Sequence, residues 1–417
     1  KDMKTEPLYP YQQDAVLWLS GRTRGLLRLK AGYGKTRCLL EAATLGVSTS
    51  TPILILCPKS VIGSWEHEIK KWGYDKFNIT VTNWDKLISW SCLKKLKGYK
   101  WEVVIGDESH RALRNPETQR AKAFNEILRR RPDARIYLAT ATVAGNSAAD
   151  YYQTFEILIS KSLGDYKTWQ KKFCNIVDCA YSYSGVKYAG FKEEETPTIK
   201  KILDKISFTV SDEYANLHLP PEVIVPLAQP FDIGLDAMSE ALSISTGSLE
   251  TMLEQGTTPP AHIATYVKSV GLAKVVPACD WIESFPEDES LVIFAWHRDV
   301  IYQLSTQLNI PRIMGDTPQD IRDKLIQQFQ NGEIKRLVLN IQSGGVGISL
   351  HQKCNNALFV EMPWSTTAFV QAKARIRRIG SKNPCFYHIM TMQKTIDTKI
   401  LEVLEYKQKN IERIENV

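Results

Sequence analysis

The sequence predicts an α/β protein of two domains, each a mainly parallel β-sheet flanked by helices. Its 417 residues suggest two or three domains at about 150 residues each. Short apolar and β-branched runs alternate with helical patterns, which is typical of parallel α/β units, and these runs form two series along the chain. A segment with two adjacent prolines separates the series, and proline interrupts helices and sheets because it fixes φ and lacks an N–H donor.

The first series lies in the N-terminal half of the chain. Strands are expected at residues 53–57, 101–106 and 135–140, which are continuous runs of the kind found in strands buried on both faces. The stretch at about 151–205 is aromatic and helical with a turn-rich centre. We therefore expect a helical insertion in the first domain.

The second series predicts four further strands. They are expected at residues 291–295, 336–340, 357–360 and 386–390. We place the domain boundary near Tyr214, just before the paired prolines, which gives domains of residues 1–214 and 215–417. The polar stretch 243–260 contains glycine and proline, so it is expected to form a loop or a mobile hairpin.

Charge and composition narrow the class of protein. The formal net charge of +7 permits binding to a polyanion without requiring it. No apolar run approaches the roughly 20 residues that cross a bilayer, so we expect no membrane partner. Eight cysteines without a C-x-x-C pair indicate reduced thiols and an intracellular protein, in the cytoplasm, nucleoid or nucleus. The chain starts at Lys1 without an initiator Met or an apolar leader, so we expect a trimmed or processed chain with no readable targeting signal. We also expect a monomer.

A glycine-rich turn stands between an expected strand at residues 26–30 and a helix-compatible stretch at residues 37–45. The turn reads Gly32, Tyr33, Gly34, Lys35 and Thr36. Backbone N–H groups of such a turn close around phosphate oxygens at a helix N-terminus. Lys35 would reach the β and γ phosphates of ATP, and Thr36 would offer its hydroxyl to Mg²⁺. An ordinary tight turn is the alternative, but the order of strand, turn and helix favours a nucleotide site.

Two adjacent carboxylates end the expected strand at residues 101–106. Asp107 would hold Mg²⁺, mostly through water, and Glu108 could take a proton from the attacking water. The alternative is an acidic helix N-terminus, where Asp and Glu are favoured in any case. The glycine turn upstream favours the catalytic interpretation.

A third group lies near the C-terminus, in an expected helix at residues 366–380. Gln371, Arg375 and Arg378 are four and three residues apart, so on a helix they share one face. The planar, permanently charged guanidinium group can stabilise charge on a transferring phosphoryl group. We therefore predict that both arginines act in catalysis; a solvated basic helix is the alternative.

Together these segments resemble the motor core of the superfamily 2 helicases and translocases, within them the Swi/Snf-type group. The matching segments are Tyr9–Gln12, Pro58–Trp72, Val81–Trp84, Asp107–His110, Thr140–Asn146, Ser343–Leu350 and Gln371–Gly380. Asp107–His110 stands for the family's D-E-A-H, with Ser109 in place of alanine. The nearest subgroup is the annealing-helicase, or fork-remodelling, branch, which has counterparts of Leu219–Pro221 and Gly271–Lys274.

The resemblance implies two RecA-like domains with an ATP cleft between them, and further site residues. Gln12 would contact adenine, and Gly347 and Gln371 would also bind the nucleotide. The residues implied in nucleic-acid contact are Lys59, Ser60, Trp84, Asn146, Ser343, Gly344 and Gly345. Trp65 and Trp84 could stack on bases. Packing in the core or at its rim is the more common role of tryptophans at strand and helix positions, and we favour it for both.

The function implied is ATP- and Mg²⁺-dependent translocation on duplex or branched DNA, which would remodel forks, junctions or protein–DNA complexes. A helicase that separates DNA or RNA strands is one alternative. An ATP-gated subunit that clamps nucleic acid without hydrolysis is an alternative of another class. We expect DNA as the partner, with RNA as the alternative, and a second protein for targeting.

Overall fold

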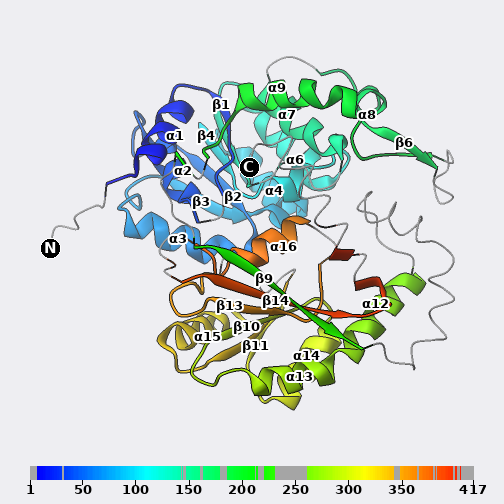
Figure 1. Cartoon of the computed structure of the whole chain (residues 1–417). Coiled ribbons are helices and arrows are strands. Elements are labelled where there is room, and N and C mark those ends of the chain that lie inside the picture. The colour runs from blue at the N-terminus through cyan, green and yellow to red at the C-terminus, as the bar shows by residue number, and fades with distance from the viewer. Residues whose placement is uncertain are drawn as a thin grey trace. The chain divides into compact units, whose positions relative to one another are not determined.

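The computed structural model describes residues 7–30, 32–141, 143, 147–159, 163–178, 186–211, 213–214, 220–230, 261–341, 348–363, 366–378, 381, 383–397, 400–401 and 404. The chain divides into two compact units, called here the first and the second unit, with the division between residues 217 and 218 (Figure 1). Each unit is an α/β structure with its own sheet and its own hydrophobic core.

The first unit contains a six-stranded sheet with the order β3-β2-β4-β5-β1-β8. Its strands are β1 Arg24–Leu27, β2 Ile53–Cys57, β3 Ile79–Asn83, β4 Val103–Gly106, β5 Arg135–Ala139 and β8 Ser207–Phe208. All neighbouring strands pair in parallel. The three predicted strands are confirmed as β2, β4 and β5, whose apolar residues are buried on both sides of the sheet.

Helices connect these strands. They are α1 Pro10–Ser20, α2 Lys35–Thr44, α3 Ile62–Lys71, α4 Trp90–Gly98, α5 His110–Leu113, α6 Gln119–Leu128, α7 Tyr152–Leu158, α8 Tyr166–Phe173 and α9 Thr196–Ile206. Short 3₁₀ turns are η1 Lys59–Val61, η2 Trp84–Ile88, η3 Ala148–Tyr151 and η4 Glu193–Glu195. Helices that connect parallel strands typically cover both faces of the sheet.

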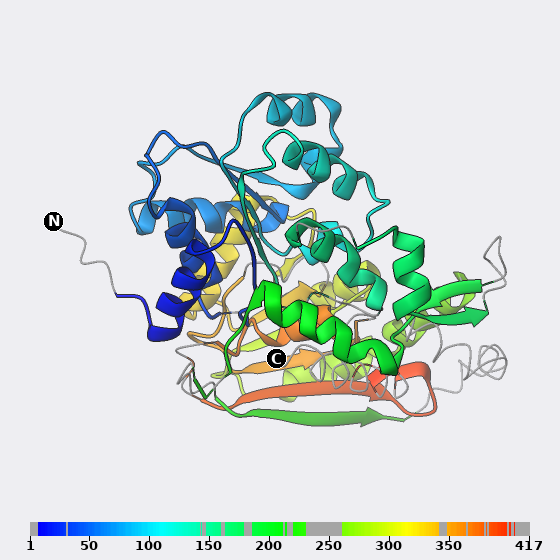
Figure 2. The same ribbon diagram turned by 90° about the horizontal axis from the view of Figure 1, so that it is seen from above.

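The predicted insertion contains α7, α8, α9 and an antiparallel hairpin. The hairpin strands are β6 Asn175–Asp178 and β7 Val186–Ala189, and the hairpin extends away from the helices (Figure 2). Trp169 and Phe173 of α8 are buried in the core of the first unit, so α8 packs on the domain rather than forming a separate one. Helix α9 then returns the chain to β8 beside β1.

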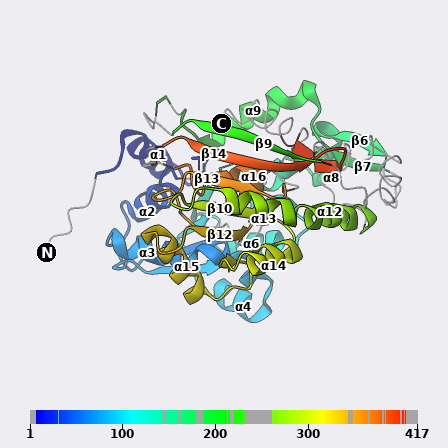
Figure 3. The ribbon, with the colours of Figure 1, turned by 60° about the horizontal axis from the view of Figure 1, so that its bottom comes forward.

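The second unit contains another six-stranded sheet, with the order β11-β12-β10-β13-β14-β9 (Figure 3). Its strands are β9 Glu222–Gln229, β10 Leu291–Ala295, β11 Arg312–Ile313, β12 Arg336–Asn340, β13 Asn356–Phe359 and β14 Cys385–Met392. These strands also pair in parallel. The four predicted strands are confirmed as β10, β12, β13 and β14. The edge strand β9 was not predicted.

The helices of the second unit follow the same alternation. They are α12 Ala261–Ala273, α13 Val275–Ser284, α14 Arg298–Gln307, α15 Gln319–Asn331 and α16 Thr366–Lys373. The stretch predicted as a loop at residues 243–260 lies outside the described residues. Within the residues that the structure describes, no helix is long and apolar enough to span a membrane.

Candidate nucleotide site

The glycine turn after β1 leads directly into α2. Gly34 precedes the helix and has a left-handed backbone (φ 73°), which favours glycine. Space gives a second reason, because a Cβ at residue 34 would lie 2.3 Å from Nε2 of Gln12. The first N–H groups of α2 have no acceptor within the helix, so this helix end is suited to bind an anion.

Lys35 and Thr36 form the first turn of α2 and are half-buried. Nζ of Lys35 donates to the carbonyl oxygen of Leu29 at 2.8 Å, so the ammonium group folds back over the turn. A phosphate oxygen bound there could replace this carbonyl as the acceptor.

Gln12 of α1 is fixed against the same turn. Its Nε2 donates to the carbonyl oxygen of Tyr33 at 3.2 Å, and its Oε1 accepts from the N–H of Tyr9 at 3.1 Å. The hydroxyl of Tyr11 donates to the same Tyr33 carbonyl at 3.2 Å. Gln12 thus stabilises the glycine turn through the Tyr33 carbonyl. The adenine contact implied by the resemblance stays a prediction.

Asp107 and Glu108 follow β4. Oδ1 of Asp107 accepts from the N–H of Glu108, and Oδ2 accepts from the indole N–H of Trp65, both at 3.0 Å. Burial raises the pKa of Asp107 to about 6; the Glu108 carboxylate adds to the increase, and Lys35 opposes it. Among the described residues, no cationic side chain forms an ion pair with Asp107.

Glu108 has a left-handed backbone (φ 46°), which is strained for a side chain other than glycine. Its Oε2 lies 3.3 Å from Nδ1 of His110, and that nitrogen lies 2.8 Å from the hydroxyl of Thr140. Burial, with smaller contributions from Arg114 and Arg111, lowers the pKa of His110 well below its usual value, so the ring is neutral. The contacts link Glu108 to the end of β5, where the segment Thr140–Asn146 begins.

The residues present fit a magnesium ion. Mg²⁺ is usually held by one or two carboxylates or hydroxyls together with phosphate oxygens and water. A half-buried carboxylate with a raised pKa, and without an ion pair among the described residues, is a suitable ligand, because a divalent cation favours its ionised form. Asp107 and Thr36 are the residues that would hold the ion.

The predicted arginine helix is shorter than expected. Helix α16 ends at Lys373, whereas the prediction extended it to residue 380. Beyond the helix, the carbonyl oxygen of Arg375 accepts from the N–H of Leu350 at 2.9 Å. The chain turns instead, with the N–H of Arg375 donating three residues back to Ala372. The prediction that Gln371, Arg375 and Arg378 share one helix face is therefore wrong.

Both arginines contact main-chain oxygens. The buried Arg375 donates from Nη1 to the carbonyl oxygen of Ile348 at 3.3 Å. Arg378 donates from Nε to the carbonyl oxygen of Ala374 at 3.0 Å, and burial lowers its pKa. Gln371 is half-buried in α16.

The predicted nucleic-acid residues divide into three groups. Lys59 is exposed on η1. Trp84 is only 3% exposed and packs edge-on against Phe124, as expected for packing in the core, and its contact with nucleic acid stays a prediction. Asn146, Ser343, Gly344, Gly345 and Gly347, and the side chain of Ser60, lie outside the described residues.

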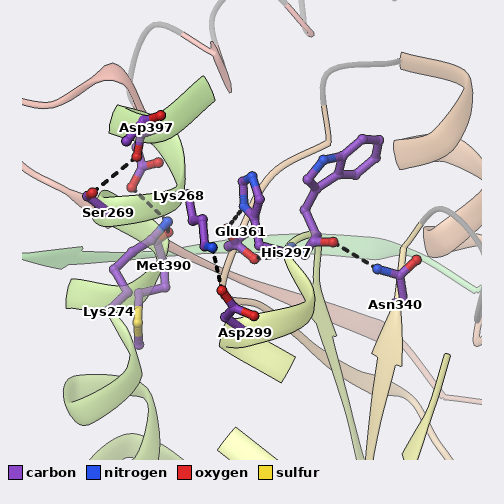
Figure 4. A network of polar contacts seen from close by, with 11 residues as sticks. Lys268, Ser269, Lys274, His297, Asp299, Asn340, Glu361, Met390 and Asp397 are labelled. Carbon is purple, nitrogen blue, oxygen red and sulfur yellow. Dashed lines mark hydrogen bonds and ion pairs between the residues drawn. The ribbon is translucent and has the colours of Figure 1, made fainter. Parts of the chain in front are cut away.

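Sequence reasoning missed a polar cluster in the second unit, where β10, β12 and β13 end (Figure 4). Glu361 follows β13 and is 4% exposed. Its Oε2 accepts from the N–H groups of Trp296 and His297, both at 2.8 Å, and its Oε1 lies 2.6 Å from Nδ1 of His297. Asn340, at the end of β12, donates to the carbonyl oxygen of Trp296 at 2.8 Å. These contacts fix the segment between β10 and α14.

Helix α12 packs directly on this cluster. A Cβ at Gly271 would lie only 2.2 Å from Oε1 of Glu361, so the carboxylate occupies the space that a side chain would need. The resemblance of Gly271–Lys274 to the fork-remodelling branch was a sequence signal that pointed here.

A second buried carboxylate lies nearby. Nζ of Lys274 lies 2.8 Å from Oδ2 of Asp397, and both side chains are at most 5% exposed. Lys274 also donates to the carbonyl oxygen of Met390 at 3.3 Å, and Asp397 accepts from the N–H of Met392 at 2.9 Å. The pair ties the junction of α12 and α13 to β14 (Figure 4).

Two family matches cover separate parts of the chain. Residues 5–144 match the family described as type III restriction enzyme, res subunit. Residues 274–380 match the helicase conserved C-terminal domain. The first match includes the glycine turn and Asp107, and the second includes Gln371 and both arginines.

The chain is similar to several known proteins. It is 23% identical over 436 residues to the SWI/SNF-related matrix-associated actin-dependent regulator of chromatin subfamily A-like protein 1 homolog of Caenorhabditis elegans, covering 96% of this chain and 61% of the relative. It is 25% identical over 443 residues to the DNA annealing helicase and endonuclease ZRANB3 of Bos taurus, covering 96% and 40%. A solved structure, the Sulfolobus solfataricus SWI2/SNF2 ATPase core in complex with dsDNA, aligns over 98% of this chain and 93% of that chain, at 21% identity and a TM-score of 0.45.

The chain thus spans less than two thirds of the length of these curated relatives. The two family matches follow each other in the order of the two sheets, and the relatives cover nearly the whole chain. The matches and the relatives together support a superfamily 2 helicase or translocase of the Swi/Snf type, with similarity to the annealing helicases.

Proposed function

We propose that this chain is an ATP-dependent DNA translocase that couples ATP hydrolysis to movement along duplex or branched DNA. One observation carries the proposal: the glycine turn with Lys35 and the pair Asp107–Glu108 follow strands β1 and β4 of a single parallel sheet. The carboxyl ends of parallel strands share one edge, where α/β proteins bind nucleotides.

Each group in the first unit has one role in this proposal. The amides at the start of α2 and the Lys35 ammonium bind the triphosphate. Glu108 accepts a proton from the attacking water, and the neutral His110 ring orients its carboxylate. Asp107 and Thr36 would hold Mg²⁺, which when bound neutralises charge on the phosphates.

Arg375 and Arg378 of the second unit are proposed to act on the transferring phosphoryl group during turnover. Each would exchange a main-chain acceptor, the carbonyl oxygen of Ile348 or of Ala374, for phosphate oxygens. Arg378 is the stronger candidate, because burial lowers its pKa and a bound anion would offset that cost.

DNA is the proposed partner. One relative is described as a DNA annealing helicase, which supports this choice. Lys59, exposed on η1, is suited to contact the phosphate backbone. Backbone contacts predict wide sequence tolerance and an affinity that falls steeply with salt.

The test is an ATPase assay with linear duplex, forked and four-way DNA, single-stranded DNA and RNA. We expect stimulation by duplex DNA without a single-stranded tail. Glu108→Gln is the control, and it should lower kcat by about 100- to 10,000-fold while nucleotide binding persists.

Other outcomes would assign another function. Stimulation by single strands or RNA alone would indicate a strand-separating helicase. No hydrolysis with any nucleic acid, together with ATP-dependent binding, would indicate a non-hydrolysing clamp. Equal rates for the native chain and Glu108→Gln would remove the role assigned to Glu108.

A further inference from the structure

Two buried tryptophans from different segments of the first unit meet at Asp107. Trp65 lies on α3 and is 1% exposed, and its indole N–H donates to Oδ2 of Asp107 at 3.0 Å. Trp84 is the first residue of η2, directly after β3, and its indole N–H donates to the main-chain oxygen of Asp107 at 2.8 Å. The residue predicted to hold Mg²⁺ thus accepts an indole hydrogen bond at its side chain and another at its backbone.

The two tryptophans belong to the segments that the resemblance associates with nucleic-acid contact. Trp65 stands six residues after the exposed Lys59, and α3 follows η1 without a break. Trp84 stands in a turn that Asn83 fixes, because the side chain of Asn83 accepts from the N–H of Lys86 at 3.0 Å. A shift of either segment would therefore be passed on to an indole ring.

The contact to the carboxylate is specific. Within the part of the chain that the structure describes, Trp65 is the one side chain that donates a hydrogen bond to the Asp107 carboxylate. A buried indole has two side-chain torsions and is held by packing on all sides. When its backbone segment moves, the ring therefore moves with it. Partners of metal ligands commonly set ligand orientation in this way.

We propose that Trp65 and Trp84 are positioning residues that couple the two predicted nucleic-acid segments to the metal-binding carboxylate of Asp107. Nucleic acid that contacts the Lys59 segment or the β3–η2 turn moves the indoles, and the indoles set the orientation of Asp107. This inference rests on the proposed function, since it explains how nucleic acid would stimulate hydrolysis without touching the nucleotide.

The test compares Trp65→Phe and Trp84→Phe with Trp101→Phe. Phenylalanine keeps a buried ring and removes the N–H donor. Trp101 is a matched control, because it is also 3% exposed in the core of the first unit and donates to a main-chain oxygen, that of Leu96, at 2.8 Å. Its hydrogen bond is made to α4 and not to Asp107.

Four quantities would be measured for each variant: Mn²⁺ affinity with ADP by electron paramagnetic resonance, affinity for duplex DNA, kcat with saturating DNA, and Tm. We expect Trp65→Phe to lose about tenfold or more in Mn²⁺ affinity and in DNA-stimulated kcat. The affinity for DNA should stay within about twofold of the native value, since a mutation in the coupling leaves the binding surface intact. Trp84→Phe should lower Mn²⁺ affinity and DNA-stimulated kcat by about threefold, because it removes a hydrogen bond to the main chain of Asp107 and none to its carboxylate.

Trp101→Phe should lower Tm to a similar extent as Trp84→Phe and leave Mn²⁺ affinity and kcat unchanged. The proposal is overturned if Trp65→Phe matches Trp101→Phe in Mn²⁺ affinity, because the tryptophan then serves packing alone. The Mn²⁺ measurement needs no hydrolysis and no DNA. A native chain that DNA fails to stimulate would therefore defeat the proposed function, while the link from Trp65 to Asp107 would still be tested.

Discussion

Asp107 in the first unit and Glu361 in the second are comparable carboxylates that differ in their hydrogen-bond partners. Each follows a buried parallel strand, β4 or β13, at the carboxyl edge of its sheet. Glu361 is satisfied by the protein, with two backbone N–H donors and one histidine nitrogen. Asp107 accepts two hydrogen bonds, and burial raises its pKa to about 6. The carboxyl end of a buried parallel strand thus carries a carboxylate that we propose as a metal ligand in the first unit and a structural carboxylate in the second.

The strongest test of this contrast is Asp107→Asn. We expect kcat to fall about 1000-fold, since the metal supplies several kcal/mol of transition-state stabilisation. The same change should stabilise the fold in metal-free buffer at neutral pH by about 1–3 kcal/mol, because the folded-state pKa of Asp107 lies above its unfolded value and the ionised form is disfavoured. Urea unfolding of both proteins in the presence of EDTA measures this difference in unfolding free energy. A loss of stability would mean that Asp107 is as fully satisfied as Glu361.

Removing a partner from a satisfied carboxylate should have the opposite effect. Lys274→Met leaves Asp397 buried without its ion pair, and we expect a loss of about 3–5 kcal/mol in the free energy of unfolding. Lys268→Met is the control, because the Lys268–Asp299 pair is exposed and should contribute about 0–1 kcal/mol. Similar losses for both variants would contradict the structural role assigned to the Lys274–Asp397 pair.

The space taken by Glu361 can be tested from the side of α12. Gly271→Ala should destabilise the chain by about 1–3 kcal/mol, because the new Cβ meets Oε1 of Glu361. In a Glu361→Ala background the same change should become neutral or stabilising by about 1 kcal/mol, since alanine is the better helix former. Chemical unfolding of the native chain, the two single variants and the double variant gives the coupling between Gly271→Ala and Glu361→Ala. Additive costs would show that Gly271 is required for another reason.

The smallest expected effect concerns His297. His297→Phe removes the ring nitrogen from Glu361 and keeps both backbone donors, so we expect a loss of about 1 kcal/mol in unfolding free energy. Differential scanning calorimetry would detect it. No loss would show that the two main-chain N–H groups alone satisfy the carboxylate.

The comparison also shows what the sequence could predict. Strands such as β2 and β10 were predicted because their residues are apolar throughout, and such runs are typical of strands buried on both faces. The glycine turn was predicted because its conformation depends on residues close in sequence. The edge strand β9 was missed because its residues are largely exposed and its register comes from β14, far along the chain.

What the sequence could not predict in the site has the same origin. The turn after α16 includes a hydrogen bond between Leu350 and Arg375, two residues far apart in sequence, and helical periodicity does not predict such a contact. The burial of Trp84 is decided by its packing on Phe124, so a motif position alone could not distinguish a base-stacking ring from a core ring. Glu361 gave no local pattern, because its donors come from the segment after β10, more than sixty residues earlier.

The attachment of β9 has a mechanical consequence. This first strand after the division between the units pairs with β14 at all eight of its positions, and Glu222 at its start forms ion pairs with Lys373 and Arg377. A pull on the chain before β9 would load these hydrogen bonds in shear, all at once, instead of opening them one after another. The second sheet is thereby built to bear tension from its connecting segment without losing its edge.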